Sequence, residues 1–216
     1  MTGTQPATIG VANANFVTDF LAVGGDLDMF DDRLAIRQAS DLLVIGRITH
    51  ILDVREECDD EEFWAGVQGL TYHWDGIDDA GQEVPGEWFE RITLWARLAL
   101  LAPGARILTH CHMGINRGPS AAFAILLALG WEPVAALEAI RIARPVAYVS
   151  YAEDALRWHD ERIGASAEVR RHHRAALSHW RLTHDLDVAN VIRKIRQEEL
   201  RSATRPSGAS GSSTSP

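Results

Sequence analysis

The sequence predicts an α/β protein with a central, mostly parallel sheet flanked by helices. Short runs of β-branched and apolar residues alternate with helical patterns along residues 16–165, an order typical of strands joined by helices. The chain of 216 residues is long enough for one domain with a hydrophobic core of its own. Its 2 cysteines cannot form a disulfide framework, so packing rather than cross-linking must hold the fold together.

The first part of the chain alternates strands with helices. Residues 16–23 read as one or two strands that end at a pair of glycines, and 29–45 is mainly helical. The apolar run 49–54 suits a buried strand. Residues 59–68 begin with acidic side chains and carry aromatic residues on one side, which predicts an amphipathic helix. Residues 70–74 predict a further strand.

The second part continues this alternation and ends in helices. Residues 85–101 predict a helix with a proline near its start. Residues 106–110 predict a strand, and the strongly apolar segment 118–129 predicts a helix at the centre of the fold. Two shorter helices are expected near residues 133–143 and 151–162.

Composition divides the chain into four segments. An N-terminal segment, residues 1–15, precedes the predicted domain over 16–165. Residues 166–200 carry apolar side chains at helical spacing and predict a helical extension. Residues 201–216 are almost all Ser, Thr, Gly, Ala and Pro, which bury too little apolar surface to offset the entropy of ordering. This tail is therefore expected to be disordered.

The net charge and the apolar runs exclude several classes of protein. The chain has 21 Lys and Arg against 30 Asp and Glu, a formal charge of −9, whereas general nucleic-acid and anionic-membrane binders need a basic surface. No apolar run reaches the roughly 18 residues of a membrane span, and the N-terminus lacks the basic and apolar regions of a signal peptide. We therefore expect a cytoplasmic protein that binds neither nucleic acid nor membrane.

The stretch 106–120 carries the most informative chemistry. It reads RILTHCHMGINRGPS, a predicted strand that runs into Cys111, then five loop residues, then Arg117 at the start of an apolar helix. A loop between a strand and a helix N-terminus directs several backbone N–H groups at one point, which suits a phosphoryl group. Arg117 can bind two oxygens of such a group at once, and Gly114 gives the tight loop its backbone freedom.

The same surroundings act on Cys111. Amide dipoles, the helix N-terminus and the charge of Arg117 all stabilise a thiolate relative to a thiol, which makes Cys111 a candidate nucleophile without a neighbouring base. A thiolate that attacks phosphorus expels an alkoxide or phenoxide, and this leaving oxygen needs a proton from a nearby carboxylic acid. The loop at residues 75–83 contains three candidates, which are Asp75, Asp78 and Asp79.

His110 and Cys111, five further residues and Arg117 resemble the active-site loop of the cysteine-dependent protein phosphatases. The compact dual-specificity group of the tyrosine phosphatase superfamily is the nearest match, and the resemblance covers about residues 16–160. It implies a dual-specificity-phosphatase-like fold, a phosphocysteine intermediate on Cys111, a supporting role for His110, and no cofactor or metal. The loop residues that it implies for phosphate binding are His112, Met113, Gly114, Ile115, Asn116 and Arg117.

The same resemblance favours Asp79 as the general acid. In that group the acid lies on a loop between a strand and a helix upstream of the cysteine, and the 32 residues from Asp79 to Cys111 fit this arrangement. Tyr72 and Phe89 resemble the positions that flank the acid. Asp78 stays open as an alternative, with Asp75 as a further candidate.

The resemblance implies a protein phosphatase that acts on phosphotyrosine, with phosphoserine and phosphothreonine as further substrates. Two alternatives stay open: a phosphatase of a small-molecule, lipid or nucleotide phosphomonoester, and a catalytically weak interaction module that binds phosphate. The second follows from Gly118, because the group usually has a Ser or Thr there, whose hydroxyl assists the thiolate as it leaves. Cys58 is a candidate disulfide partner for an oxidised Cys111.

Overall fold

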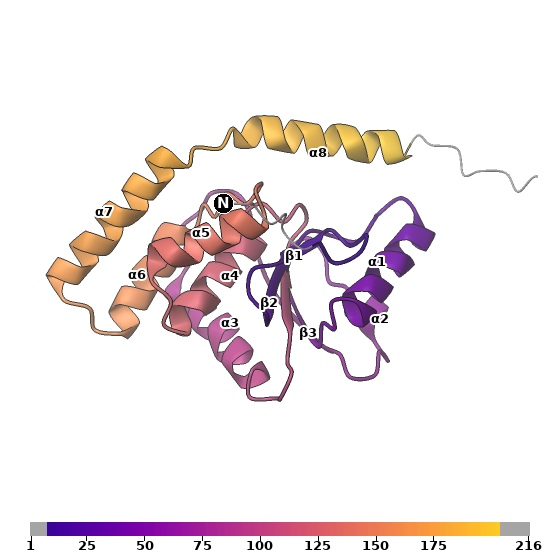
Figure 1. Cartoon of the computed structure of the whole chain (residues 1–216), viewed down its shortest axis with the longest axis horizontal. Helices are drawn as coiled ribbons and strands as arrows, with labels where there is room; N and C mark the ends of the chain where they lie inside the picture. Colours follow the sequence, from indigo (N-terminus) through magenta and orange to yellow (C-terminus); the bar gives the residue numbers. More distant parts are fainter. Residues whose placement is uncertain (1–7, 204–216) are drawn as a thin grey trace, which may run out of the picture.

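Five strands form the central sheet of the computed structural model, which describes residues 8–203 (Figure 1). Their order across the sheet is β1-β2-β5-β3-β4, with β1 antiparallel to β2 and the other neighbours parallel. The strands are β1 (Ala14–Phe16), β2 (Leu21–Gly24), β3 (His50–Arg55), β4 (Thr71–Ile77) and β5 (Ile107–His110). The predicted α/β fold with a mostly parallel sheet is thus confirmed.

Helices cover both faces of this sheet (Figure 1). α4 packs against the middle strands and is buried along nearly its whole length, as its apolar sequence predicts. α1 and α2 lie on the opposite face. In chain order the helices of the domain are α1 (Asp32–Val44), α2 (Glu61–Trp64), α3 (Gly86–Ala99), α4 (Arg117–Ala128), α5 (Pro133–Ala143) and α6 (Ala152–Arg162).

Alternation along the strands separates two hydrophobic clusters. Successive strand residues point to opposite faces, so Leu52 and Val54 of β3 pack with α3 to α6, whereas Ile51 packs toward α1 and α2. Cys111, directly after β5, belongs to the first cluster. The loop after β5 is therefore held between a central strand and a deeply buried helix, which gives functional groups a rigid support.

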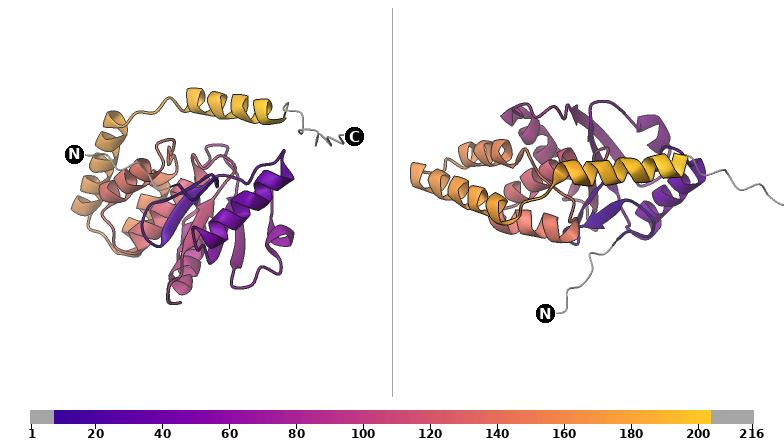
Figure 2. Two further views of the ribbon diagram at one scale, coloured as in Figure 1. Left: turned by 45° about the vertical axis from the view of Figure 1, so that its right-hand side comes forward. Right: turned by 90° about the horizontal axis from the view of Figure 1, so that it is seen from above.

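Two further helices follow the domain. α7 (Ala167–Thr183) packs against α5 and α6, and its buried residues are Leu177 and Trp180. α8 (Val188–Ala203) crosses above the loops at the carboxyl ends of the parallel strands, as both views in Figure 2 show. None of the described helices is long and apolar enough to cross a membrane.

Two predicted elements differ clearly from the structure. The helix expected over 59–68 is limited to the four residues of α2, because the backbone becomes extended at Ala65 and then left-handed at Gly66, where φ is +79°. β4 continues to Ile77 instead of ending at residue 74, which puts Asp75 inside a strand rather than in the following loop.

Both ends of the chain extend beyond the described residues. Of the N-terminal segment predicted for residues 1–15, residues 1–7 lie outside the described part, and β1 already begins at Ala14. The tail predicted to be disordered begins at residue 201, whereas α8 adds a last turn up to Ala203. The rest of that tail, 204–216, lies outside the described residues.

Candidate active site

The loop of residues 111–117 joins β5 to α4 at the middle of the sheet. Cys111 is only 3% exposed, and its N–H lies 3.4 Å from the carbonyl oxygen of Gly24 in β2. Arg117 opens α4 and is also buried. Gly114 has a φ of +64°, and a Cβ there would lie 2.6 Å from the carbonyl oxygen of Gly24. A residue with a side chain fits at this position only if the backbone moves.

A cavity of about 460 Å³ lies against this loop, a volume within the range of small-ligand sites. It brings together Cys111, Arg117 and Asp79, the three residues predicted to take part in the reaction. His110 and Gly114 do not line it, whereas the predicted phosphate-binding residues His112, Met113, Ile115 and Asn116 do. The remaining lining residues are Gly81, Tyr148 and Ser150 together with Val188, Ile192 and Arg196 of α8.

Arg117 is held by Glu57, a residue that the sequence pattern did not single out. Nη1 and Nη2 of Arg117 donate to the two carboxylate oxygens of Glu57 at 2.5 and 2.6 Å, and Nη1 also donates to the carbonyl oxygen of Ile77 at 3.0 Å. The hydrogen bonds from Arg117 hold the pKa of Glu57 at about 2. Glu57 lies three residues after the strand predicted over 49–54, and this position was the signal available in the sequence.

One edge of the Arg117 guanidinium, formed by Nε and Nη2, is available to a ligand. Its N–H groups point in fixed directions, and those that face Glu57 and Ile77 are occupied. The Nε proton and the other Nη2 proton are parallel, and Nε has no hydrogen-bond acceptor among the described residues. Oδ2 of Asp79 lies 3.5 Å from this Nε. A phosphate that binds through two oxygens to the Nε–Nη2 edge would therefore lie beside Asp79.

Asp79 reaches the cavity from the loop after β4. Its Oδ1 accepts a hydrogen bond from Asn116 Nδ2 at 2.6 Å and one from the Tyr151 hydroxyl at 3.2 Å. Burial, and then the charge of Asp79, raise the pKa of Tyr151 to about 12, so this hydroxyl remains a donor at neutral pH. Asn116 is fixed in turn, because its Oδ1 accepts bonds from the backbone N–H and the hydroxyl of Ser150 at 2.7 and 2.6 Å.

The other two candidate acids have different surroundings. Asp78 does not line the cavity, and its Oδ1 accepts the backbone N–H of Asp79 at 2.7 Å. Asp75 lies in β4 and forms a two-pronged pair with Arg91 at 2.8 and 2.9 Å. Of the three aspartates, the structure brings only Asp79 to the cavity that contains Cys111.

A charged network lies behind the loop. His112 Nδ1 is 2.7 Å from Asp26 Oδ2, and this hydrogen bond raises the pKa of His112 although burial opposes the shift. Arg55 pairs with Asp26 at 2.8 Å and with Asp53 at 2.6 Å. His110 stands between the two carboxylates, 3.7 Å from Asp26 and 3.6 Å from Asp53. His110 thus contacts the network behind the loop and does not line the cavity, which is compatible with the predicted supporting role.

One group of side chains has the spacing of metal ligands. Asp53, Asp60 and His110 bring one possible ligand atom each within 4.8 Å of one another. The guanidinium of Arg55, however, donates to both carboxylates, at 2.6 and 2.5 Å. Arg55 therefore supplies the positive charge that these carboxylates need, and the donor set does not favour a metal ion there.

Arg144 binds the backbone of the loop through hydrogen bonds. Its Nε donates to the carbonyl oxygen of Gly114 at 2.6 Å, and its Nη2 donates to that of Met113 at 2.9 Å. Asn13 and Asn15 accept further bonds from the same guanidinium. Burial lowers the pKa of Arg144 to about 10, while the nearby charge of Cys111 acts in the opposite direction. Arg144 thus remains a cation at neutral pH beside the cysteine.

Gly118 and Cys58 are the two remaining positions that the sequence singled out. A Cβ at Gly118 would lie 3.2 Å from the backbone nitrogen of Cys111, so any side chain there would be next to the loop cysteine. Cys58 is exposed, and Cys58 and Cys111 are both free thiols. Partial burial raises the pKa of Cys58. The charge of Arg55 opposes this shift and that of Asp60 adds to it, so the thiolate is disfavoured. Its pairing with Cys111 stays a prediction.

Solved structures resemble the chain, whereas no model of a known protein family and no curated protein matches it. PTPMT1 in complex with PI(5)P matches with a TM-score of 0.60 at 16% identity, over 72% of this chain and 99% of that chain. DUSP15 matches with a TM-score of 0.53 at 24% identity, over 75% of this chain and 95% of that chain. Human DUSP28 has a TM-score of 0.57 at 17% identity, with coverages of 74% and 99%. The predicted resemblance is confirmed at the level of the fold: the chain has the fold of the dual-specificity and tyrosine phosphatases.

Proposed function

We propose that the protein is a cysteine-dependent phosphatase that hydrolyses phosphomonoesters through a phosphocysteine intermediate. The observation that carries this proposal is that Cys111, Arg117 and Asp79 line one cavity, and that the Nε of Arg117 has no hydrogen-bond acceptor among the described residues. A nucleophile, an anion-binding fork and an acid at one cavity are the set that phosphoryl transfer to a thiolate requires. The shared fold of solved phosphatases supports the same reaction class.

The first step transfers the phosphoryl group to the protein. The ester binds with its phosphate oxygens on the loop amides and on the Nε–Nη2 edge of Arg117. Sγ of Cys111 then attacks phosphorus, so that an S–P bond forms while the ester P–O bond breaks. Protonated Asp79 donates its proton to the oxygen that leaves, and the alcohol or phenol departs neutral.

The second step hydrolyses the phosphocysteine. Asp79, now a carboxylate, takes a proton from a water molecule that attacks phosphorus, and the S–P bond breaks to release inorganic phosphate and the Cys111 thiolate. A bound dianionic phosphate disfavours the ionised form of Asp79 beside it, so substrate binding favours protonated Asp79, the acid for the next cycle. The scheme requires no cofactor.

Two substrate classes are compatible with this chemistry. Phosphotyrosine in a protein is the substrate that the loop implies, with phosphoserine and phosphothreonine as further possibilities. The lining of the cavity by α8 supports the alternative, a small phosphomonoester, because Val188 and Ile192 add a wall beside Cys111 that a protein substrate would have to pass. We therefore propose small phosphomonoesters as the main substrates.

Hydrolysis of para-nitrophenyl phosphate tests the reaction. We expect Cys111→Ser to abolish turnover, and we expect Asp79→Asn to reduce kcat by about 10²- to 10⁴-fold, the usual contribution of a general acid. Asp78→Asn is the matched control and should retain wild-type activity, since its side chain does not line the cavity.

Three results would contradict parts of this proposal. Activity that survives Cys111→Ser would exclude the thiolate mechanism. Loss of activity in Asp78→Asn but not in Asp79→Asn would transfer the acid role to Asp78. A wild-type protein that binds vanadate tightly but turns over no ester would be a phosphate-binding module rather than an enzyme.

A further inference from the structure

α8 forms part of the wall around Cys111, although it lies outside the segment that resembles dual-specificity phosphatases. Val188, Ile192 and Arg196 are four residues apart along one face of the helix, and all three line the cavity that contains Cys111. Ile195 lines a second cavity of about 190 Å³, which shares His112 with the first. Residues of α8 therefore line both cavities, and the view from above in Figure 2 shows the helix crossing over the domain.

Arg196 is the charged residue of this cavity whose side chain has no partner among the described residues. The other charged side chains that line it are Asp79, His112 and Arg117, and each has a hydrogen-bond partner within the protein. The side chain of Arg196 forms no hydrogen bond or ion pair with any described residue. A guanidinium donates through parallel N–H groups and matches carboxylate and phosphate oxygens in particular.

We propose that Arg196 binds a second anionic group of the substrate. The preferred substrate is then a small phosphomonoester that carries a further carboxylate or phosphate group: its reacting phosphate lies on Arg117 and the loop amides, and its second acidic group lies on Arg196. This inference rests on the proposed phosphatase function and names the substrate class for the same cavity.

The charge distribution of the chain supports this assignment. Residues 1–165 carry a formal charge of −13, so an anionic substrate gains nothing from the body of the domain as a whole. Attraction has to come from individual cations at the cavity, and Arg196 adds such a charge from a different element than the loop. Because Arg196 belongs to α8, a doubly anionic substrate would also hold the helix over the site.

A matched pair of substrates tests the assignment. Phenyl phosphate carries one anionic group, and its meta- and para-carboxylated derivatives carry two. We expect Arg196→Gln to lower kcat/KM for the better carboxylated ester by about 10- to 100-fold, the effect of losing one charge-assisted hydrogen bond. Phenyl phosphate should change less than about threefold, within the scatter of exposed charge effects. Arg196→Lys should restore part of the loss, since it keeps the charge without the fork.

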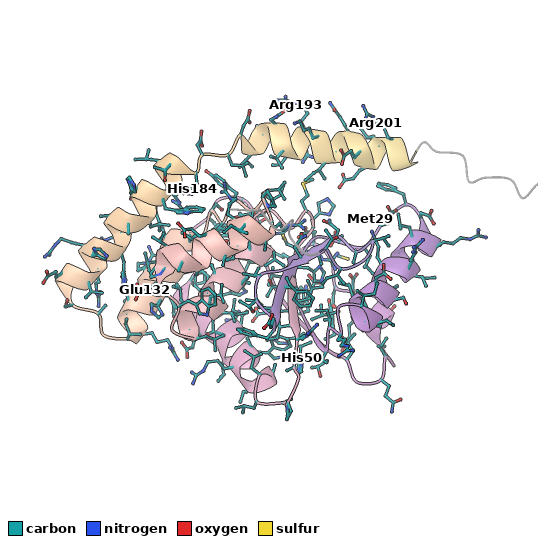
Figure 3. All side chains as sticks on the ribbon, in the orientation of Figure 1. Met29, His50, Glu132, His184, Arg193 and Arg201 are labelled. Carbon is teal, nitrogen blue, oxygen red and sulfur yellow. The ribbon has the colours of Figure 1, made fainter. Side chains whose placement is uncertain are left out.

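Arg193→Gln is the matched control. Arg193 is exposed and points from α8 away from the domain (Figure 3), so its removal changes the same net charge without touching the cavity. It should leave both esters unaffected. Equal losses for the two esters in Arg196→Gln, or no loss for either, would overturn the assignment.

A binding measurement separates this inference from the proposed reaction. In a Cys111→Ser background, calorimetry gives the Kd of each intact ester without turnover. Tighter binding of the carboxylated ester that disappears when Arg196→Gln is added supports the assignment even if the wild type hydrolyses neither compound. Equal Kd values with and without Arg196 would overturn it, whatever the wild-type activity is.

Discussion

Gly118 distinguishes this chain from the phosphatases whose loop it resembles, which usually have Ser or Thr at that position. A Cβ there would lie 3.2 Å from the backbone nitrogen of Cys111, so a side chain would stand directly beside the nucleophile. We expect Gly118→Ser to speed hydrolysis of the phosphocysteine by about 10- to 100-fold, because one hydrogen bond to a charged group contributes roughly 1.5–3 kcal/mol. Rapid-quench kinetics, which separate the burst from the steady state, measure this step.

Gly118→Ala is the control for crowding. It adds the same Cβ, which needs a shift of a few tenths of an ångström against Cys111 and His110, but it carries no hydroxyl. If Ser and Ala change the steady-state rate equally, the hydroxyl has no role in this protein and the slow step lies elsewhere.

The candidate site was predictable from the sequence only where its residues are neighbours in the chain. Cys111 and Arg117 belong to one loop whose order the chemistry requires. Glu57, which occupies two N–H groups of Arg117, comes from a segment 60 residues away and meets it only through the pairing of β3 with β5. Among the three aspartates, sequence alone cannot decide, because Asp78 and Asp79 are adjacent and differ only in the direction of their side chains.

At the scale of a single element, α8 is held weakly. None of its described side chains is buried, and the half-buried ones include Val188, Val191, Ile192 and Ile195. α4, by contrast, is buried along nearly its whole length. Local opening requires little free energy where few apolar contacts are lost. We therefore expect amide hydrogens of α8 to exchange with solvent far faster than those of α4 in native-state hydrogen exchange.

Loosening α8 should change which substrates reach Cys111. Ile192→Ser removes apolar contact worth about 1 kcal/mol for a half-buried side chain, so we expect roughly fivefold faster exchange in α8 and faster hydrolysis of a phosphotyrosine peptide. Leu182→Ser is the control, because Leu182 is 82% exposed on α7. Peptide hydrolysis that stays unchanged while α8 exchanges faster would show that the helix does not limit access.

The elements themselves were predictable to different degrees. α4 could be recognised because a buried central helix needs apolar residues on all sides. α2 was overestimated because aromatic residues on one side of a segment require only a single turn, and Gly66 then breaks the helix. β4 was underestimated because Asp75 and Gly76 look like turn residues. Yet both residues fit a strand here: Asp75 is paired with Arg91, and Gly76 lies so close to the Arg55 carbonyl oxygen of β3 that a Cβ would clash with it.

At the scale of the whole molecule, one ionic network joins the carboxyl ends of three adjacent strands. Asp26, just beyond β2, bonds to Arg55 at the end of β3 and to His112 just beyond β5. Burial would raise the pKa of Asp26, but the imidazoles of His110 and His112 and the charge of Arg55 outweigh it and lower the pKa to about 2. No periodicity in the sequence signals this network, since its members come together only when the strands pair.

The network predicts how stability depends on pH. A carboxyl whose pKa is lowered contributes stability above its ordinary value of 3.8, and this contribution, about 2 kcal/mol for Asp26, is lost as the pH falls toward 2. The raised pKa of His112 has the opposite sign: its contribution is present below the ordinary value of 6.5 and is lost as the pH rises through the raised value. Both contributions coexist between about pH 4 and 6.5.

We therefore expect Asp26→Asn to reduce the free energy of unfolding most between about pH 4 and 6.5, and less both as the pH falls toward 2 and as it rises through the raised pKa of His112. Urea denaturation of the wild type and the variant across this pH range measures the difference. Asp32→Asn, on the exposed start of α1, removes the same charge outside the network and should give a small difference that hardly varies with pH. A constant difference for Asp26→Asn would mean that the residue acts through packing alone. A difference that follows both titrations would establish that the loop carrying Cys111 and the ends of three strands are stabilised as one ionic unit.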